Sequence, residues 1–593
     1  MRFRLGAFGL LAAAGVFSFT GDAGAQQLRY STTQPGGIVA TGNTLGLAKG
    51  FNENGPGLQD SIGTFISLDP SSVDDNPLNA GNPWSGNTTW DWTQNGSDAV
   101  LTLPDGAKVL YAELVWAGSY DYIENVSAFL DGPVTIGYGN DAVAVNPSPA
   151  TAQTFAETSF TGFAANYYIR SADVTAFVEQ HGTGLYDVSG VPATQTDTIN
   201  SLNAAGWSLV VAFRGEDQPV RNLTVFVGGS FVDEDSQQDY IVSGFCAPPF
   251  GPVEGNVVVS ALEGDADLTG DILQLSQTDA GPFTTLAGPN NPSDNFFSSQ
   301  INDDTGNLDT FGTFGNANHD PFLGENVAGG RQGWDVTTLP LSSMSGLLDN
   351  NQTSAVVRTV TTGDSYVPTL VALEIDVKAP DFSASSTDAS VDVVQDGDMF
   401  TLTATLSNSG EALANNLRYV MPLPQGLELL GYSTNGTSGD VSGFPVTPTM
   451  LMDGVDAGQL AVNDTITVVM DLAVTGAPAN GGSFLFSPMW EHDFITCDGD
   501  DAIEESFSPP TETVAYMAET PDPGTGGMGG TGGTGGMGGG TTSAGGSGVD
   551  DDDVIEEDGG CGCTIPGHDD DDNTAPLLAI AALGLVAARR RRQ

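Results

Sequence analysis

Strict alternation of apolar and polar residues is the feature that most constrains the fold of this chain. Between residues 400 and 406, Phe, Leu, Ala and Leu alternate with three threonines, and residues 466–474 alternate in the same way. A period of two puts one set of side chains on each face of a β-strand, so we predict strands with one buried face and one wet face. Residues 110–116 and 207–213 carry the pattern into the N-terminal half.

Turn signals separate these runs, and long amphipathic helical patterns are missing. The turn signals are Pro104-Asp105-Gly106, Asn435-Gly436 and Asn480-Gly481. The best helix candidate is short: it runs from Ser171 to Glu179, with Asp173 as its cap. We therefore predict an all-β protein.

Changes in composition divide the chain. A boundary at Ala379-Pro380-Asp381 separates residues 28–378, a large N-terminal β-sandwich region with room for two subdomains, from a second β-unit at 380–516. Residues 517–560 form a tether, because the Gly/Thr/Met stretch 524–548 and the acidic run after it cannot bury a core. Residues 561–593 form the C-terminal segment. We expect the tether to be disordered.

The N-terminal end has the three parts of a signal peptide. Arg2 and Arg4 form a basic region, residues 5–19 are apolar, and Ala23-Gly24-Ala25 is a small-residue cleavage site. We expect removal of residues 1–25, with cleavage after Ala25, and therefore export.

The C-terminal segment has a cysteine pair, an apolar stretch and a basic end. Cys561 and Cys563 precede the apolar residues 576–588, which are followed by Arg589, Arg590, Arg591 and Arg592. Thirteen helical residues reach about 20 Å, short of the roughly 30 Å hydrocarbon core. We expect a short transmembrane helix that acts as a transient stop for a processing enzyme, with the arginines on the cytoplasmic side.

The charge of the chain restricts its partners. There are 16 Lys and Arg against 75 Asp and Glu, a formal net charge of −59. Such a charge repels nucleic acid and anionic lipid, and suits a hydrated exterior, divalent-cation binding or salty water. Of the four cysteines, Cys246 and Cys497 are isolated; a bridge between them is one interpretation, and a lone buried thiol at each is the favoured one.

Two resemblances concern the C-terminal half. The residues from Gly559 through the cysteines, apolar stretch and arginines resemble the C-terminal sorting signal of myxobacterial surface proteins. This implies processing near a cysteine and anchoring at the outer surface of a Gram-negative outer membrane, with lipid attachment or release to the medium as options. Residues 381–475, with Thr-Leu-Thr-Ala-Thr-Leu-Ser-Asn-Ser-Gly at 401–410 and Pro-Leu-Pro-Gln-Gly-Leu at 422–427, resemble the immunoglobulin-like repeat of bacterial surface proteins. This implies a β-sandwich spacer without catalytic residues.

The N-terminal region also resembles a known arrangement. Its segments Ala-Gly-Trp-Ser-Leu-Val-Val at 205–211 and Arg-Asn-Leu-Thr-Val-Phe at 221–226 are similar to the large region that precedes such repeats in cell-surface proteins. The resemblance implies location and architecture, and brings no activity with it.

The sequence contains few of the motifs that mark catalytic sites. The chain has four histidines and lacks a Gly-x-Ser-x-Gly elbow, a His-Glu-x-x-His helix and a P-loop. Carboxylate pairs occur throughout so acidic a chain, so their spacing discriminates nothing. We therefore predict that the chain is not an enzyme. A secreted or anchored carbohydrate-processing enzyme remains an alternative.

One segment has the pattern of a metal site. Asp265, Asp267 and Thr269 occupy relative positions one, three and five, followed by Gly270 and Asp271. Carboxylates and a hydroxyl at these positions, with a glycine at six, resemble the start of an oxygen-rich calcium loop. Position twelve is a serine where such loops have a bidentate glutamate. A calcium site at Asp265, Asp267, Thr269 and Asp271 and a polar turn are both open, with the turn favoured, and no other cofactor is predicted.

These patterns together predict a non-enzymatic protein anchored at the cell surface, for adhesion or structural display. The predicted partners are the cell envelope and its sorting machinery, extracellular polysaccharide, and surface proteins of neighbouring cells, and nucleic acid is excluded. A calcium-dependent binding module is a further alternative.

Overall fold

The computed structural model describes residues 26–518, except 51–52, 59–60, 77–80, 123, 158–164, 196–201, 216–217, 234–235, 321, 342–346, 437–445 and 497–501. The predicted signal peptide with Ala25, the predicted tether beyond residue 518, and the C-terminal segment predicted to hold a cysteine pair, a helix and an arginine cluster lie outside the described residues. Strands make up 49% of the structure and helices 5%, so the protein is all-β as predicted. Within the described ranges, no helix is both long and apolar enough to span a membrane.

The first β-unit is built around one long strand, β1 (Gln27–Thr44). Its C-terminal half pairs with β12 (Ala205–Arg214) and its N-terminal half with β13 (Val220–Val227), both antiparallel. The change of partner falls at Gly36, where a Cβ atom would lie 2.0 Å from the Phe213 carbonyl oxygen, so only glycine fits there. β1 therefore belongs to both halves of a nine-stranded sheet.

The sheet has the order β19-β15-β21-β13-β1-β12-β6-β10-β9. The other strands are β6 (Lys108–Ser119), β9 (Gln153–Glu157), β10 (Ala165–Asp173), β15 (Gly255–Leu262), β19 (Trp334–Pro340) and β21 (Val367–Asp376). Its two halves face each other, because β12 contacts β15 and β19, and β6 contacts β21. Val115, Val210, Val225 and Val258 belong to the buried cluster between the halves.

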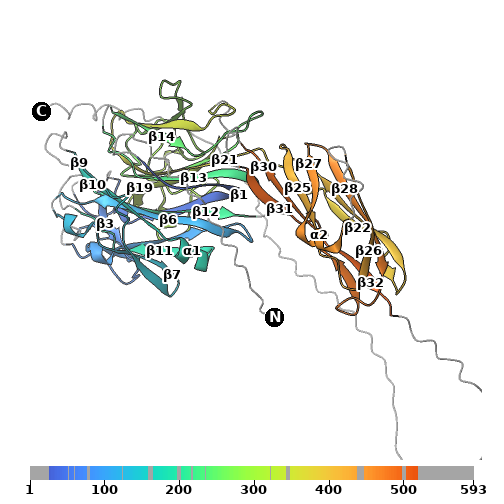
Figure 1. Ribbon diagram of the computed structural model, residues 1–593. Coiled ribbons are helices and arrows are strands. Elements are labelled where there is room, and N and C mark those ends of the chain that lie inside the picture. The colour runs from blue at the N-terminus through green and yellow to red at the C-terminus, as the bar shows by residue number, and fades with distance from the viewer. Residues whose placement is uncertain are drawn as a thin grey trace, which may run out of the picture. The chain divides into compact units, whose positions relative to one another are not determined.

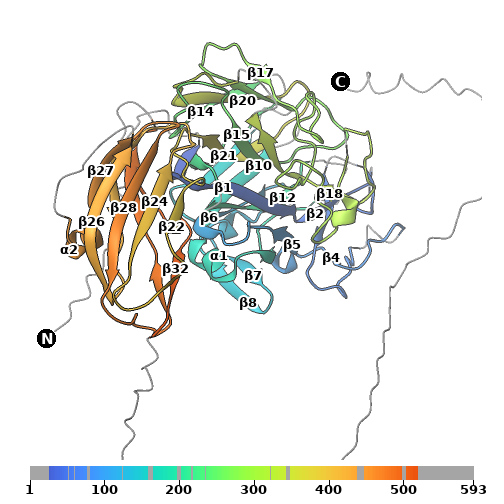
Figure 2. The same cartoon turned by 90° about the vertical axis from the view of Figure 1, so that its right-hand side faces the viewer.

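Two smaller sheets cover the outer faces of these halves. One has the order β5-β11-β7-β8, with β5 (Gly96–Leu101), β7 (Val134–Tyr138), β8 (Asp141–Val145) and β11 (Gly184–Ser189). The other has the order β14-β20-β16-β17, with β14 (Gln237–Ser243), β16 (Ile272–Ser276), β17 (Thr284–Thr285) and β20 (Ser354–Val360). Figure 2 shows β14, β17 and β20 on one side of β15 and β21, and β7 and β8 beyond β6. The unit is thus four β-layers deep.

A short sheet extends the first unit beyond the end of β1. Its order is β18-β2-β3-β4, with β2 (Gly46–Ala48), β3 (Ile62–Ile66), β4 (Thr88–Thr89) and β18 (Arg331–Gln332). This sheet follows β1 directly, because only Leu45 separates Thr44, the last residue of β1, from Gly46, the first residue of β2.

The depth of the stack corrects one prediction. The segments 110–116 and 207–213 do form strands, β6 and β12, but neither has a wet face: Leu110 is partly buried, and residues 111–116 and 207–213 are all buried. The face predicted to be wet is instead covered by the opposing half of the same sheet. The residues of a single strand do not show which segment will form such a third layer.

The second unit is an immunoglobulin-like β-sandwich of strands β22 to β32. Its sheets are β22-β24-β28-β26, β27-β25-β30-β31 and β23-β32-β29. The strands are β22 (Ser386–Ala389), β23 (Val393–Val394), β24 (Met399–Ser407), β25 (Ala414–Val420), β26 (Leu427–Gly436), β27 (Val455–Leu460), β28 (Thr465–Val474), β29 (Ser483–Phe486), β30 (Met489–Phe494), β31 (Ile503–Phe507) and β32 (Glu512–Tyr516). They are drawn in yellow to red in Figure 1. Among the described residues, no sheet joins strands from both sides of residue 380.

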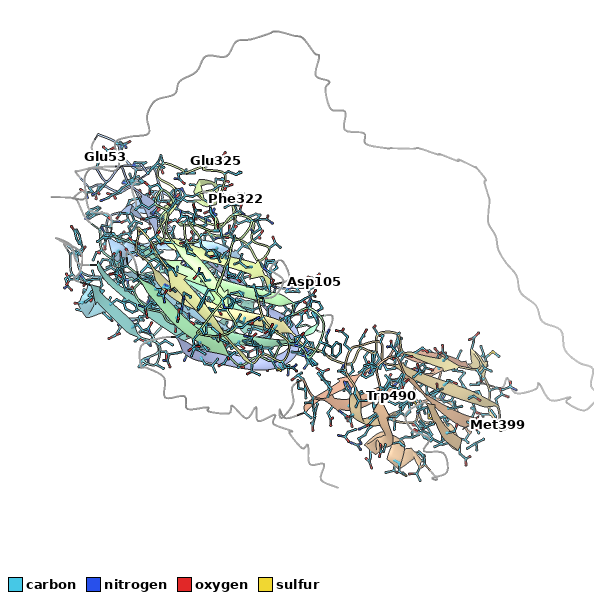
Figure 3. The ribbon with its side chains drawn as sticks, turned by 90° about the horizontal axis from the view of Figure 1, so that it is seen from above. Glu53, Asp105, Phe322, Glu325, Met399 and Trp490 are labelled. Carbon is cyan, nitrogen blue, oxygen red and sulfur yellow. The ribbon has the colours of Figure 1, made fainter. Side chains whose placement is uncertain are left out.

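Burial in this second unit follows the alternation predicted from the sequence. Along β24 and β28 every second residue is buried, and the residues between them are partly or fully exposed. Trp490 lies in the core between the sheets, whereas Met399 at the start of β24 is 72% exposed (Figure 3). Asn435-Gly436, predicted as a turn, forms the end of β26 instead.

Helices are short. α1 (Thr175–His181) begins later than the predicted Ser171, because residues 171–173 belong to β10 and pair with β6. Asp173 still stabilises the start of the helix: its Oδ1 accepts the Thr175 N–H at 2.9 Å. The remaining helical elements are α2 (Pro448–Asp453), η2 (Trp92–Gln94), η3 (Ser127–Phe129) and η4 (Gly315–Ala317).

Candidate functional site

Two chain connections run side by side at one end of the first unit. β15 and β21 are antiparallel neighbours, and Leu262 at the end of β15 pairs with Val367 at the start of β21. In the covering sheet, Ile272 at the start of β16 pairs with Val360 at the end of β20. Residues 263–271 and 361–366 therefore cross between the same two sheets at the same end. The Thr362 N–H donates to the Gly270 carbonyl at 3.3 Å and joins the two crossings directly.

These crossings bring buried carboxylates together. Ligand oxygens of Glu263, Asp265 and Asp364 lie within 4.8 Å of one another. Their residues are 2%, 1% and 9% exposed, and Asp271 on the same crossing is fully buried. We call these four residues the crossover cluster.

Three hydrogen bonds to the cluster come from neutral groups. The Gln332 Nε2 donates to Asp265 Oδ1 at 2.9 Å. The Ser365 N–H donates to Asp364 Oδ1 at 2.7 Å, and its hydroxyl donates to Glu263 Oε2 at 3.3 Å. Such donors orient the carboxylates without neutralising them. Glu263 has a φ of 83°, a left-handed conformation unusual for a non-glycine residue.

The neighbouring Tyr167 lies in the electric field of these acids. It is fully buried, and its hydroxyl donates to the Leu202 carbonyl at 3.0 Å. Burial raises the pKa of Tyr167 well above its ordinary value, and the nearby charges of Glu263, Asp265 and Asp364 raise it further. The phenol therefore stays neutral.

Asp271 is the least satisfied member of the cluster. Among the described residues, neither of its oxygens has a hydrogen-bond partner of ordinary geometry. Burial raises the pKa of Asp271 well above its usual range; the charges of Asp364 and Asp335 act in the same direction, and the Thr361 hydroxyl opposes them.

Asp335 of β19 lies beside the cluster. Its Oδ1 accepts the N–H groups of Ser298 and Gln300 at 2.9 and 2.8 Å. Burial raises the pKa of Asp335 to about 7, although these backbone hydrogen bonds lower it. Its Oδ2 is buried and has no hydrogen-bond partner among the described residues.

The structure divides the calcium-loop candidates between two environments. Asp265 and Asp271 are buried in the cluster, whereas Asp267 and Thr269 are exposed. Ser276, at the position of the missing glutamate, is the last residue of β16, and its hydroxyl donates to the Thr278 carbonyl at 2.8 Å. The four residues proposed from sequence thus do not converge as one loop.

Two members of the cluster were missed by the sequence interpretation. Glu263 lies just outside the loop pattern, two residues before Asp265. Asp364 lies about a hundred residues further along, in a Thr-Gly-Asp-Ser segment typical of a turn. Only the pairing of β15 with β21 shows that they meet.

Cys246 corrects another expectation. It is 5% exposed and disulfide-bonded, so the favoured interpretation of a lone buried thiol is wrong for this residue. Its partner lies outside the described residues, as do Cys497, Cys561 and Cys563.

No protein-family model matches the chain, and no curated protein matches it. Solved structures give low scores. The N-terminal domain of a Streptococcus gordonii adhesin has a TM-score of 0.20 and 9% identity, over 80% of this chain and 98% of that one. A Corynebacterium diphtheriae protein described as membrane-anchored has a TM-score of 0.16 and 9% identity, over 82% and 97%. A Streptococcus pneumoniae glycoside hydrolase domain has a TM-score of 0.13 and 12% identity, over 48% and 33%. Scores this low transfer no function.

Proposed function

We propose that this chain is a non-enzymatic protein displayed at the outer cell surface, where its first β-unit makes adhesive or structural contacts. The observation that carries the proposal is the order of parts: two all-β units, which share no sheet within the part of the chain that the structure describes, precede the glycine-rich stretch 524–548. The composition of the glycine-rich stretch is typical of a tether. This arrangement suits the presentation of the first unit away from an anchor.

An exposed turn favours adhesion over a purely structural role. Asp320 and Glu325 exchange backbone hydrogen bonds of 2.9 and 2.8 Å. The turn between them presents Phe322, which Figure 3 labels, and Leu323. Phe322 is 57% exposed and Leu323 is 69% exposed. Burial of exposed apolar side chains at a loop tip by a partner surface lowers the free energy and so favours binding. The proposed partners are polysaccharide or surface proteins of a neighbouring cell.

The anchoring half of the proposal is tested on intact cells. Protease added to cells that express the full chain should remove the two β-units, because they lie outside the envelope. Replacement of both Cys561 and Cys563 by Ser should release the protein to the medium or leave an unprocessed form. Asp569→Asn with Asp571→Asn, in the same segment, is the matched control and should leave anchoring unchanged. A double cysteine variant that stays at the surface with the wild-type mass would refute the sorting mechanism.

The non-enzymatic half is tested with purified protein. When polysaccharides are incubated with the protein, we expect no release of new reducing ends, whether or not the polysaccharide binds. Catalytic release of reducing ends would replace this proposal with the carbohydrate-processing alternative.

A further inference from the structure

The crossover cluster has the composition of a cation site rather than of an ordinary turn. Glu263, Asp265 and Asp364 supply oxygens from two separate crossings, all within 4.8 Å of one another. Calcium binds oxygen ligands at 2.3–2.6 Å, so two ligands on opposite sides of it lie up to about 5 Å apart. The spacing of the three carboxylates therefore fits one calcium ion between them.

An independent observation comes from Asp271. It is fully buried, and the described residues offer neither of its oxygens a hydrogen bond of ordinary geometry. It follows Gly270, whose carbonyl accepts the Thr362 N–H at 3.3 Å, so Asp271 lies next to the crossing that carries Asp364. Buried carboxylates cost several kcal/mol unless they are paired or bind a metal. Asp271 thus offers further buried carboxylate oxygens near the three-carboxylate group, with no hydrogen bond of ordinary geometry among the described residues.

The ligand chemistry selects among cations. The cluster offers carboxylate oxygens only, which suit hard cations such as calcium and magnesium and not zinc or copper. Magnesium needs near-ideal octahedral geometry with ligands at 2.0–2.1 Å, whereas calcium accepts irregular arrangements of six to eight oxygens. The carboxylates come from two separate crossings, and Glu263 has a left-handed backbone conformation. Such an irregular arrangement suits calcium better than magnesium.

We propose that Glu263, Asp265 and Asp364, assisted by Asp271, bind a calcium ion that fastens the two crossings between the stacked sheets. The site differs from a linear calcium loop, because Asp267 and Thr269 are exposed and take no part. The bound ion joins the end of β15 to the start of β21, and so stabilises the half of the first unit that contains the second covering sheet. This inference does not depend on surface display.

Thermal unfolding of the purified full chain tests the proposal. Protein stripped with a chelator should gain roughly 3–6 °C in Tm when calcium is present at about 100 times its Kd. Sodium chloride at the same ionic strength should give a smaller rise, because it only screens the negative charge. An equal rise in the two salts, or no rise in 10 mM calcium chloride, would overturn the site. A larger rise with magnesium chloride would overturn the choice of calcium.

Variants then locate the site. Glu263→Gln with Asp364→Asn should abolish the calcium shift. In chelator this variant should melt at or above the wild-type temperature, because two repelling buried charges are gone, which also shows that it folds. Asp267→Asn with Thr269→Ala is the matched control and should keep the full shift. If the control loses the shift and the cluster variant keeps it, the linear loop is the site and the proposal is wrong.

Discussion

Ser208 of β12 and Ser260 of β15 share a hydrogen bond of 2.9 Å between their hydroxyl oxygens, in the layer where the two halves of the nine-stranded sheet face each other. The Trp334 Nε1 also donates to the Ser208 hydroxyl, at 3.0 Å, and the Thr369 hydroxyl donates to Ser260 at 3.1 Å. All four residues are buried. A short polar chain therefore crosses the buried layer between the two halves.

Ser208→Ala should destabilise the first unit by about 1–3 kcal/mol, because it leaves the Trp334 indole N–H buried without an acceptor. Urea unfolding followed by tryptophan fluorescence measures the change. Ser407→Ala, which removes the exposed Ser407–Thr465 hydroxyl pair of the second unit, should change stability by less than about 0.5 kcal/mol. Equal effects of the two substitutions would contradict this role of Ser208.

Glu113 of β6 is the centre of a buried ionic group. It is 0% exposed and accepts hydrogen bonds from Arg29 Nε at 3.1 Å, from the Ser171 hydroxyl at 2.5 Å and from the Tyr111 hydroxyl. Glu113→Gln should destabilise the first unit by about 3 kcal/mol, because it leaves the half-buried Arg29 without its counter-charge. Chemical denaturation at constant pH gives the value.

The control for Glu113 is an exposed ion pair. Arg418 and Glu491 are 3.1 Å apart, with side chains 47% and 40% exposed. Solvent screens this pair, so Glu491→Gln should cost less than about 1 kcal/mol. If Glu491→Gln lowers the free energy of unfolding as much as Glu113→Gln does, burial does not determine how much stability an ion pair contributes.

His492 of β30 makes the second unit sensitive to acid. The residue is 6% exposed, and burial lowers the pKa of His492 to about 4, although the charge of Asp493 raises it. Glu505 Oε2 lies 4.0 Å from its Nε2, and the Phe382 ring packs edge-on against it at 4.9 Å. The unfolded chain binds a proton below about pH 6.5. The folded chain does not, so stability falls as the pH drops from 6.5 towards 4.

His492→Phe removes this titration and keeps the ring. Between about pH 6.5 and pH 5, the wild type should lose about 2 kcal/mol more than the variant. Unfolding midpoints in urea at several pH values across this range give both curves. Parallel curves for the two proteins would show that His492 does not cause the acid sensitivity.

The disulfide of Cys246 should join distant parts of the chain. Cys561 and Cys563 lie in the proposed processing segment, so we predict Cys497 as the partner. Peptide mapping without reduction should recover the linked Cys246 and Cys497 peptides. Because the closed loop is long, reduction should lower stability by up to about 5 kcal/mol in the chain-entropy model. A Cys246 peptide linked to Cys561 or Cys563 would disprove the pairing.

The exposed turn at Asp320–Glu325 provides the test of adhesion. Phe322→Ser with Leu323→Ser should weaken binding to the partner surface several-fold without a change in Tm, because both side chains are solvent-exposed. Binding of protein-coated beads to cells of the same strain is the measurement. Ile241→Ser on β14, which is 69% exposed, is the matched control. Equal loss from the control variant would indicate a non-specific effect of surface apolarity.

The sequence predicted strands better than it predicted their surroundings. Along β24, threonines alternate with buried apolar residues, so the pattern predicted both the strand and its solvent-exposed face. Along β6, Tyr111, Val115 and Ala117 stand between the alternating apolar residues. Their apolar character indicated a second buried face, but the layer that covers it comes from β13 to β21, more than a hundred residues away.

The crossover cluster was predictable only in part, for the same reason. Asp265 and Asp271 lie within one short segment, so their spacing could be recognised. Asp364 joins them through the pairing of Leu262 with Val367, which is a property of the folded sheet. Asp267 and Thr269 fitted the pattern equally well, yet the chain turns them outward.

The double pairing of β1 has a consequence for the order in which the first unit can fold. β1 is synthesised well before its partners, residues 206–214 and 220–227. Until they appear, both edges of an 18-residue strand are open. The half that contains β21 cannot close before residue 376. Pairings this far apart in sequence slow folding and prolong exposure to aggregation. The edges of β1 are therefore the part of the first unit most exposed to aggregation until synthesis passes residue 376.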